Sequence, residues 1–297
     1  MVDYAFLNGS QVLLLSCERA DFPEFPASRV LQRPPVIRLV DLATSPERQI
    51  GMQEVQFRCA FEFPALAGGA IIHGTSLLSS TATAGELCSS PFRHSRLDRL
   101  FVIPLDFVST DGRDTTTIGF FTLSSTIYNH PAARSPMGAG RLVPWKEWGT
   151  AGARVHSDTA DFDILRSFRV FGHRFVIAHN DWTLQKPQRI QVLSFNQAAI
   201  RRAIARGSSN RELIVTEVSS LSLPGLFLEP VESSLPYCSQ FKERRARTSR
   251  GFMEMILTED AIVSFFNVRP YRTVRLSPLT IELPQTPDGL SENILSF

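Results

Sequence analysis

Cysteine is scarce in this chain of 297 residues, which has four, and no two of them form a CxxC pair. Structural zinc sites and redox dithiols need closely spaced cysteines, so neither is expected. The even number permits two disulfides, but buried free thiols in a reducing compartment are the favoured interpretation. The four are Cys17, Cys59, Cys88 and Cys238.

An excess of one charge is also lacking, because 31 lysines and arginines oppose 29 aspartates and glutamates. The net charge of +2 predicts no general attraction to nucleic acid or to a membrane surface. Residues 63–85 carry no charge, but they contain too much Ser, Thr and Gly for a transmembrane helix. No secretory signal is recognisable at Met1–Tyr4, so a cytoplasmic or nuclear protein is expected.

Catalytic motifs are missing as well: the chain has no GxSxG nucleophile elbow and no glycine-rich phosphate loop. A histidine and aspartate group has no nucleophile beside it, so structural or exposed histidines are favoured. A DxxDxD cluster lacks the turn glycine and distal glutamate of a calcium loop, which favours a solvated acidic loop. The residues concerned are His173, His179 and Asp181 in the first group and Asp158, Asp161 and Asp163 in the second. The expectation is a protein that is not an enzyme and has no catalytic, cofactor-binding or metal-binding residue.

What the chain does contain is a long series of short apolar segments separated by turn residues, the pattern of β-strands. Asn8-Gly9 and Asp111-Gly112 are typical hairpin turns between such segments. Their flanking strands are predicted at Val2–Leu7, Gln11–Ser16, Leu100–Ser109 and Thr115–Ser124. One short surface helix is expected, capped by Asn196 and ended by Gly207.

Roughly fourteen such segments without strand–helix alternation predict an all-β fold, whose core the 22 phenylalanines can fill. The favoured architecture is a β-propeller with degenerate blades, about six or seven at about 40–45 residues each. Packed β-sandwiches are the alternative. We expect one domain over residues 1–297, with a weak break at 129–140, a flexible basic loop at 242–250 and a C-terminal tail at 284–297.

Two groups of residues are weak candidates for binding a partner. Trp145 and Trp148 can form a recognition surface, although core packing is favoured. The basic run Lys242, Arg244, Arg245, Arg247 and Arg250 can contact phosphates, although an exposed loop is favoured, as it is for Arg201, Arg202 and Arg206. The candidates for partner binding are therefore Trp145, Trp148, Arg244 and Arg245.

The segment Val143–Gly149, with the sequence VPWKEWG, resembles the VPWxxWG segment of a large group of fungal F-box proteins from the mushroom-forming lineage. Further segments resemble that group in the same order, although Ser194, Thr150 and Val155 depart from its pattern. These segments are Pro91-Phe92, Arg99–Val102, Gly172–Arg174, Val192–Asn196, Val215–Glu217 and Leu235–Tyr237. The resemblance covers roughly residues 90–275.

Members of this group have an N-terminal F-box followed by a β-rich, propeller-like region. The resemblance implies the target-binding half of a ubiquitin-ligase receptor; no F-box is recognisable here, so the adaptor would bind only through a segment upstream. A copy without its N-terminal part would leave a propeller short of a blade or a closing strand. The expected function is a non-enzymatic protein-interaction domain with an unidentified target. The alternatives are a hydrolase or glycan-active propeller enzyme, and a nucleic-acid binder that uses residues 242–250.

Overall fold

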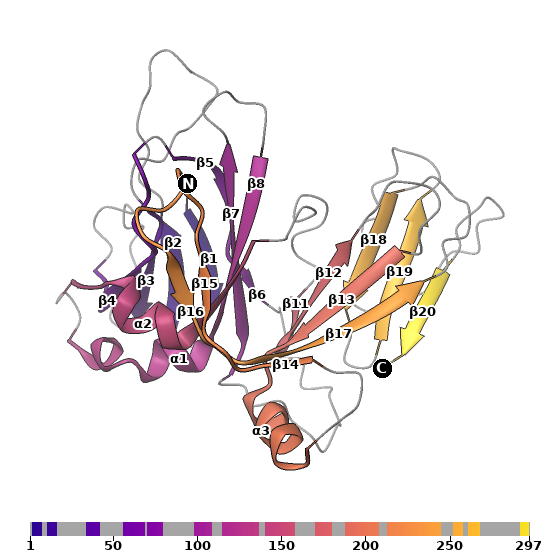
Figure 1. The fold of residues 1–297 in the computed structure, drawn as a ribbon. Coiled ribbons are helices and arrows are strands. Elements are labelled where there is room, and N and C mark those ends of the chain that lie inside the picture. The colour runs from indigo at the N-terminus through magenta and orange to yellow at the C-terminus, as the bar shows by residue number, and fades with distance from the viewer. Residues whose placement is uncertain are drawn as a thin grey trace.

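The structure is a computed structural model that describes the chain in separate stretches. These are residues 2–7, 11–16, 34–41, 56–68, 70–79, 98–108, 115–136, 140–157, 170–179, 188–207, 213–244, 252–257, 261–267 and 292–296. In these stretches the protein is mostly β, with antiparallel sheets that follow one another along the chain (Figure 1). The expected all-β class is confirmed.

Four sheets of three to five strands and one two-stranded ribbon make up the described fold. The first sheet has the order β1 (Val2–Phe6), β2 (Gln11–Ser16), β3 (Val36–Asp41), β4 (Cys59–Glu62) and β9 (Arg141–Val143). The second has the order β10 (Ala153–His156), β8 (Thr115–Leu123), β7 (Leu100–Val108) and β5 (Ile71–Thr75), with β6 (Leu78–Ser79) also paired to β7. Only the β4–β9 pair is parallel among the described strands.

The third sheet lies beside the second in the chain and in space (Figure 1). Its order is β11 (Val170–Phe171), β12 (Arg174–His179), β13 (Gln188–Ser194), β17 (Tyr237–Arg244) and β14 (Leu213–Val215). The ribbon pairs β15 (Ser219–Leu221) with β16 (Val231–Ser233), and the C-terminal sheet contains β18 (Phe252–Leu257), β19 (Ala261–Asn267) and β20 (Glu292–Ser296).

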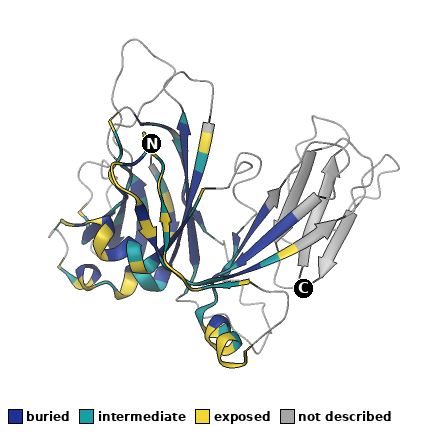
Figure 2. Ribbon diagram, in the orientation of Figure 1, coloured by how far each residue is buried: buried dark blue, intermediate teal, exposed yellow. Residues whose placement is uncertain are grey.

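The second sheet is the centre of the hydrophobic packing because both of its faces are covered (Figure 2). Side chains alternate along a strand, so β7 directs Phe101 and Ile103 into a first core shared with the first sheet. The alternate residues Leu100 and Val102 enter a second core shared with Phe175 and Leu193 of the third sheet. Burial of both faces of β7 therefore explains why nearly all of its residues are apolar.

Helices are more numerous than the sequence predicts. The expected one is α3 (Gln197–Ala205), and α1 (Ser124–Asn129), the 3-10 helix η2 (Pro131–Arg134) and α2 (Trp145–Gly152) are additional. The predicted break at 129–140 contains η2, whose Ala132 and Ala133 are buried in the first core. That segment is thus held to the first core by apolar contacts.

Two other expected boundaries change. Residues 242–244 were expected in the basic loop but end β17, where Lys242 pairs with Ile190 of β13. Residues 292–296 were expected in the C-terminal tail but form β20, which pairs with β19. In both places backbone pairing with a neighbouring strand decides the structure, and a local sequence pattern does not reveal such a partner. Residues 245–250 and 284–291 lie outside the described residues.

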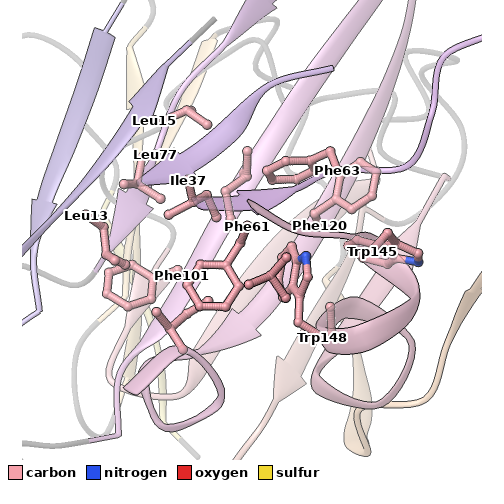
Figure 3. Packing of buried hydrophobic residues seen from close by; sticks show 14 of the residues in the cluster. Leu13, Leu15, Ile37, Phe61, Phe63, Leu77, Phe101, Phe120, Trp145 and Trp148 are labelled. Atoms are coloured by element: carbon pink, nitrogen blue, oxygen red, sulfur yellow. The ribbon is translucent and has the colours of Figure 1, made fainter. Parts of the chain in front are cut away.

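The two tryptophans of the VPWKEWG segment lie on one side of α2 and anchor it in the first core (Figure 3). The Trp148 ring packs edge-on against Phe61, with ring centroids 5.5 Å apart, and against Trp145 at 5.0 Å. Trp148 Nε1 donates a 2.9 Å hydrogen bond to the carbonyl of Glu62, so the indole N–H is satisfied inside the core. The core interpretation of both tryptophans is confirmed.

Gly149 is needed one turn after Trp145 because the indole ring lies against its backbone. A Cβ at Gly149 would stand 2.2 Å from Cε3 of Trp145, well inside van der Waals contact. The Trp145 ring cannot move away freely, since Phe63 and Phe120 pack against it. The spacing from tryptophan to glycine in this motif therefore has a packing cause.

Arg154 of β10 fastens the segment that crosses between the two cores. This crossover segment, residues 216–236, leaves β14, contributes Phe227 and Val231 to the first core and returns to β17. The buried guanidinium donates five hydrogen bonds of 2.9–3.2 Å to both legs of the segment. The acceptors are the carbonyls of Glu217, Ser233 and Leu235 and the hydroxyl of Ser219.

No carboxylate takes part in these five bonds, so Arg154 binds backbone oxygens and a hydroxyl, and no acidic residue in the described part of the chain pairs with it. Burial lowers the pKa of the Arg154 guanidinium, and Tyr237 opposes this effect. The ring of Tyr237 also lies over the guanidinium, 5.1 Å from Cζ to the ring centroid, as in a cation–π contact. One side chain thereby holds the start of β17 and both legs of the crossover segment together.

We expect Gly149→Ala to lower the free energy of unfolding by about 1–3 kcal/mol, the usual cost of overpacking a core. The reason is the contact with Trp145, which outweighs the better helix propensity of alanine, about 1 kcal/mol. Urea unfolding followed by tryptophan fluorescence measures the change. Gly68→Ala is the matched control, since a Cβ there meets no atom within 4 Å; equal midpoints for the two variants would contradict the packing argument.

We expect Arg154→Met to cost about 3 kcal/mol, because methionine keeps part of the stem but leaves buried carbonyls without a donor. The urea midpoint should fall accordingly. Arg134→Met, at an exposed arginine of η2, should change it little. Equal stability of the two variants would show that Arg154 does not hold the crossover segment.

Candidate interaction surface

The four partner-binding candidates from the sequence fall in different places. Trp145 and Trp148 are buried in the first core, so their rings give little surface to a partner. Arg244 is the last residue of β17, and its side chain and all of Arg245 lie outside the described residues. These four residues are therefore not brought together as one described surface.

His173 is buried in the turn between β11 and β12. Its imidazole lies near the carboxylate of Asp98, just before the start of β7. Its Nε2 lies 3.6 Å from Oδ2 of Asp98, and Ser125 Oγ donates a 2.7 Å hydrogen bond to Oδ1 of the same carboxylate. Burial raises the pKa of Asp98, but His173 and Ser125 together hold it below its ordinary value of 3.8.

This arrangement has the wrong order for activating a nucleophile. In a serine hydrolase the histidine stands between acid and serine, whereas here the Asp98 carboxylate contacts both Ser125 and His173. The group instead joins the start of β7, α1 and the turn before β12. His179 is on β12 with its side chain outside the described residues, as are Asp181, Asp158, Asp161 and Asp163.

Two of the four cysteines are described: Cys59 and Cys238 are both buried, and neither forms a disulfide. Burial raises the pKa of Cys59 to about 11, although Arg58 and Arg141 act against it, so the thiol stays protonated and unreactive. Within the described stretches, no three His, Cys, Asp or Glu residues gather as metal ligands. None of the helices placed by the structure has the length and apolar composition needed to cross a membrane.

The outer edge of β1 exposes two aromatic rings, Tyr4 and Phe6, but its backbone is partly occupied. Leu7 N donates to Gln11 O, so the antiparallel alternation directs the backbone groups of Tyr4 and Phe6 away from β2. Tyr4 N–H donates to the Asp3 carboxylate at 2.9 Å, and Phe6 O accepts from Arg99 at 3.4 Å. These side chains oppose the addition of another strand there.

Around α2, exposed charges are already paired within the chain. Lys146 Nζ lies 2.7 Å from Glu229, and Arg141 lies 3.0 Å from Glu147. The Lys146–Glu229 interaction raises the pKa of Lys146. A partner that approached Leu142 here would therefore find the neighbouring charged side chains already paired with each other.

A different composition appears at α3 and β14, which both pack against β17 (Figure 1). We define the α3–β14 surface as Arg201, Arg202, Ile204 and Arg206 with Leu213. Ile204 is 52% exposed and Leu213 61% exposed, and all three arginines are exposed (Figure 2). Burying the exposed half of either aliphatic side chain would release about 1 kcal/mol.

The arginines of α3 have no ion pair with any residue that the structure describes, and the helix contains no Asp or Glu. Arg202 and Arg206 are four residues apart on one face, so their charges repel each other. They also lie near the C-terminus of α3, where positive charge favours the helix dipole. A solvated helix end accounts for their positions, but it does not account for the exposure of Ile204 and Leu213.

Local interactions fix α3 in place. The Asn196 side chain accepts the N–H of Ala199 at 3.0 Å as a helix cap, and Gln197 Nε2 donates to the carbonyl of Pro236 at 2.8 Å. Ile200 is the buried residue of the helix. The sequence predicted the arginines and the cap, but not the exposure of Ile204 and Leu213. The exposure of Ile204 and Leu213 depends on their position at the end of the third sheet, and a local sequence pattern does not reveal that position.

Comparison with protein-family models, with curated proteins and with solved structures finds no significant match to this chain.

We expect the Asp98 carboxylate to stabilise the fold above its ordinary pKa, and this contribution to be lost as the pH falls through its lowered folded pKa, below 3.8. The difference in unfolding free energy between wild type and Asp98→Asn should therefore shrink below pH 3.8. Urea unfolding at each pH measures it, and a difference that does not change over the acid range would contradict the assignment.

Proposed function

We propose that the chain is a non-enzymatic protein-interaction domain that holds a target protein through side chains at the end of its third sheet. The observation that carries this proposal is the end of the third sheet, where Ile204 and Leu213 are exposed and the arginines of α3 have no described acidic partner. Arginine is among the residues that are enriched in protein interfaces and at their energetic hot spots.

The rigid support of this surface favours binding as well. Asn196, Gln197 and Ile200 fix α3, while Arg154 and Tyr237 fix the strand on which β14 is paired. A surface fixed before binding loses less conformational entropy when a partner arrives. The proposal extends the resemblance to F-box proteins, in which the β-rich region captures the target of a ubiquitin ligase.

A propeller-like architecture belongs to the same proposal. Its support is the series of mostly antiparallel sheets, the second of which packs between the first and the third. The blades of a propeller are likewise small β-sheets of adjacent strands. The position of α3 and β14 at one end of the third sheet would then place the target at one rim.

The proposal predicts target-specific degradation when the full chain is fused to a domain that recruits a ubiquitin ligase. Quantitative mass spectrometry of cells that express the fusion should show a small set of depleted proteins. Leu213→Ser should restore their levels, because it removes the most exposed aliphatic contact of the surface. Leu142→Ser should not, because this leucine is 55% exposed in a different part of the fold.

The two parts of the proposal fail separately in this experiment. No depletion by the wild-type fusion would contradict target capture. Depletion that Leu213→Ser leaves unchanged would contradict the placement of the target on α3 and β14.

A further inference from the structure

We propose that two copies of this chain associate through the open edge of β14, with the two strands antiparallel about a two-fold axis at Ile214. The pairing joins the third sheets of the two copies into one continuous sheet. This inference goes beyond the proposed function, because it concerns the backbone of the strand and assigns a second copy of the chain as its partner.

The hydrogen bonds of the third sheet show which way the backbone of each strand points. Phe195 N, just after β13, donates to His173 O at 2.8 Å, so Phe195 directs its backbone toward β12. Backbone groups alternate in direction along an antiparallel strand, and Ser194 therefore directs its N–H and carbonyl toward its partner Cys238 in β17. Cys238 in turn directs its own backbone groups toward β13.

The same alternation identifies the outward groups of β14. The two neighbours of Cys238 in β17 direct their backbone groups toward β14, where they pair with Leu213 and Val215. Ile214 lies between these two residues, so its N–H and carbonyl point away from β17, at the open edge of the third sheet. No hydrogen bond joins the backbone of Ile214 on that side to another residue that the structure describes.

Two comparable edges are protected by the chain itself. At β1 the side chains of Asp3 and Arg99 bind the outward backbone groups, and at β10 the crossover segment covers the edge. β14 has neither protection among the described residues, and Leu213–Val215 contains no charge and no proline. Charged side chains and prolines are common means by which edge strands avoid pairing, so an apolar open edge is a template for another strand.

The pattern of the strand selects a second copy as the partner. With Ile214 at a two-fold axis, each Ile214 N–H meets the carbonyl of its counterpart, and Leu213 lies opposite Val215 of the other copy. In the sequence, Arg211, outside the described residues, and Glu217 stand three residues before and after Ile214. This symmetry therefore matches opposite charges of the two copies, whereas a parallel alignment would match like charges.

The size of the contact predicts a weak dimer. Stable complexes of globular proteins bury about 800 Å² on each side, and a strand of three residues presents less. We therefore expect an equilibrium of monomer and dimer that depends on protein concentration. Leu213 also belongs to the surface proposed for the target, so a weak dimer leaves this side chain available to the target at low concentration.

The first test is sedimentation equilibrium of the full chain over a range of concentrations. We expect wild type to shift from monomer to dimer as the concentration rises, and Ile214→Pro to stay monomeric. Proline removes the N–H that the second copy needs, and because this N–H points away from β17, the third sheet keeps its own hydrogen bonds. Ile214→Val retains the N–H and is the matched control, which should dimerise as wild type does. Urea unfolding checks the fold of each variant.

Cross-linking tests the register independently of the proline variant. In the two-fold pairing the Cα atoms of Leu213 and of Val215 in the other copy lie about 4.5 Å apart, within the range of a disulfide. A mixture of the Leu213→Cys and Val215→Cys proteins should therefore form a disulfide between positions 213 and 215 on mild oxidation, identified by mass spectrometry. Neither protein alone should cross-link at its new cysteine, because the symmetry places equivalent positions beyond the limit of about 7 Å.

The inference is overturned by a wild type that is monomeric at every concentration, or by a dimer that Ile214→Pro leaves unchanged. A cross-link between two copies of the Leu213→Cys protein would show a parallel pairing and overturn the two-fold arrangement. A monomeric wild type whose target depletion is lost with Ile214→Pro would assign the edge of β14 to the target. That last result would leave the proposed function standing and refute only the pairing of two copies.

Discussion

The hydrogen bonds of Arg154 join parts of the chain that are far apart in sequence and belong to different cores. One guanidinium is bound to the carbonyls of Glu217, Ser233 and Leu235, and so it fixes both the departure and the return of the crossover segment. Buried carbonyls need donors, and here a single planar group with five N–H bonds supplies them. The packing of Phe227 and Val231 in the first core depends on this geometry.

A series of contacts leads from Arg154 to the surface of the protein. Tyr237 stacks on Arg154 and begins β17, which carries β14 on one side and β13 on the other. The carbonyl of Pro236, just before β17, accepts the hydrogen bond from Gln197 that anchors α3. The side chains offered for binding are therefore held by a chain of contacts that begins inside the protein.

The sequence predicted the parts of the fold that local chemistry decides. Apolar segments around Asp111-Gly112 indicated β7 and β8, and Asn196 with Gly207 indicated α3; both are present. The helix α2 was not predicted. Its formation depends on Phe63 and Phe120 around Trp145, which are distant in sequence.

The candidate surface shows the same division. The arginines of α3 are visible as charges in the sequence, whereas the exposure of Leu213 follows from its place on the last strand of the third sheet. β17 was missed for a related reason: Lys242, Glu243 and Arg244 resemble a solvated loop, but their backbone pairs with Gln188–Ile190. The resemblance to F-box proteins is a prediction that the sequence motifs alone support.

The segment that covers the outer edge of β10 is synthesised long after β10 itself. Val155 N–H donates to the Ser233 hydroxyl and Ala153 O accepts from Leu235 N–H, so residues about eighty positions downstream complete this strand. At about 5–20 residues per second, a ribosome needs on the order of ten seconds to deliver them. During that interval the β10 edge of the nascent second sheet is unpaired. This exposed edge is where a chaperone would bind the chain.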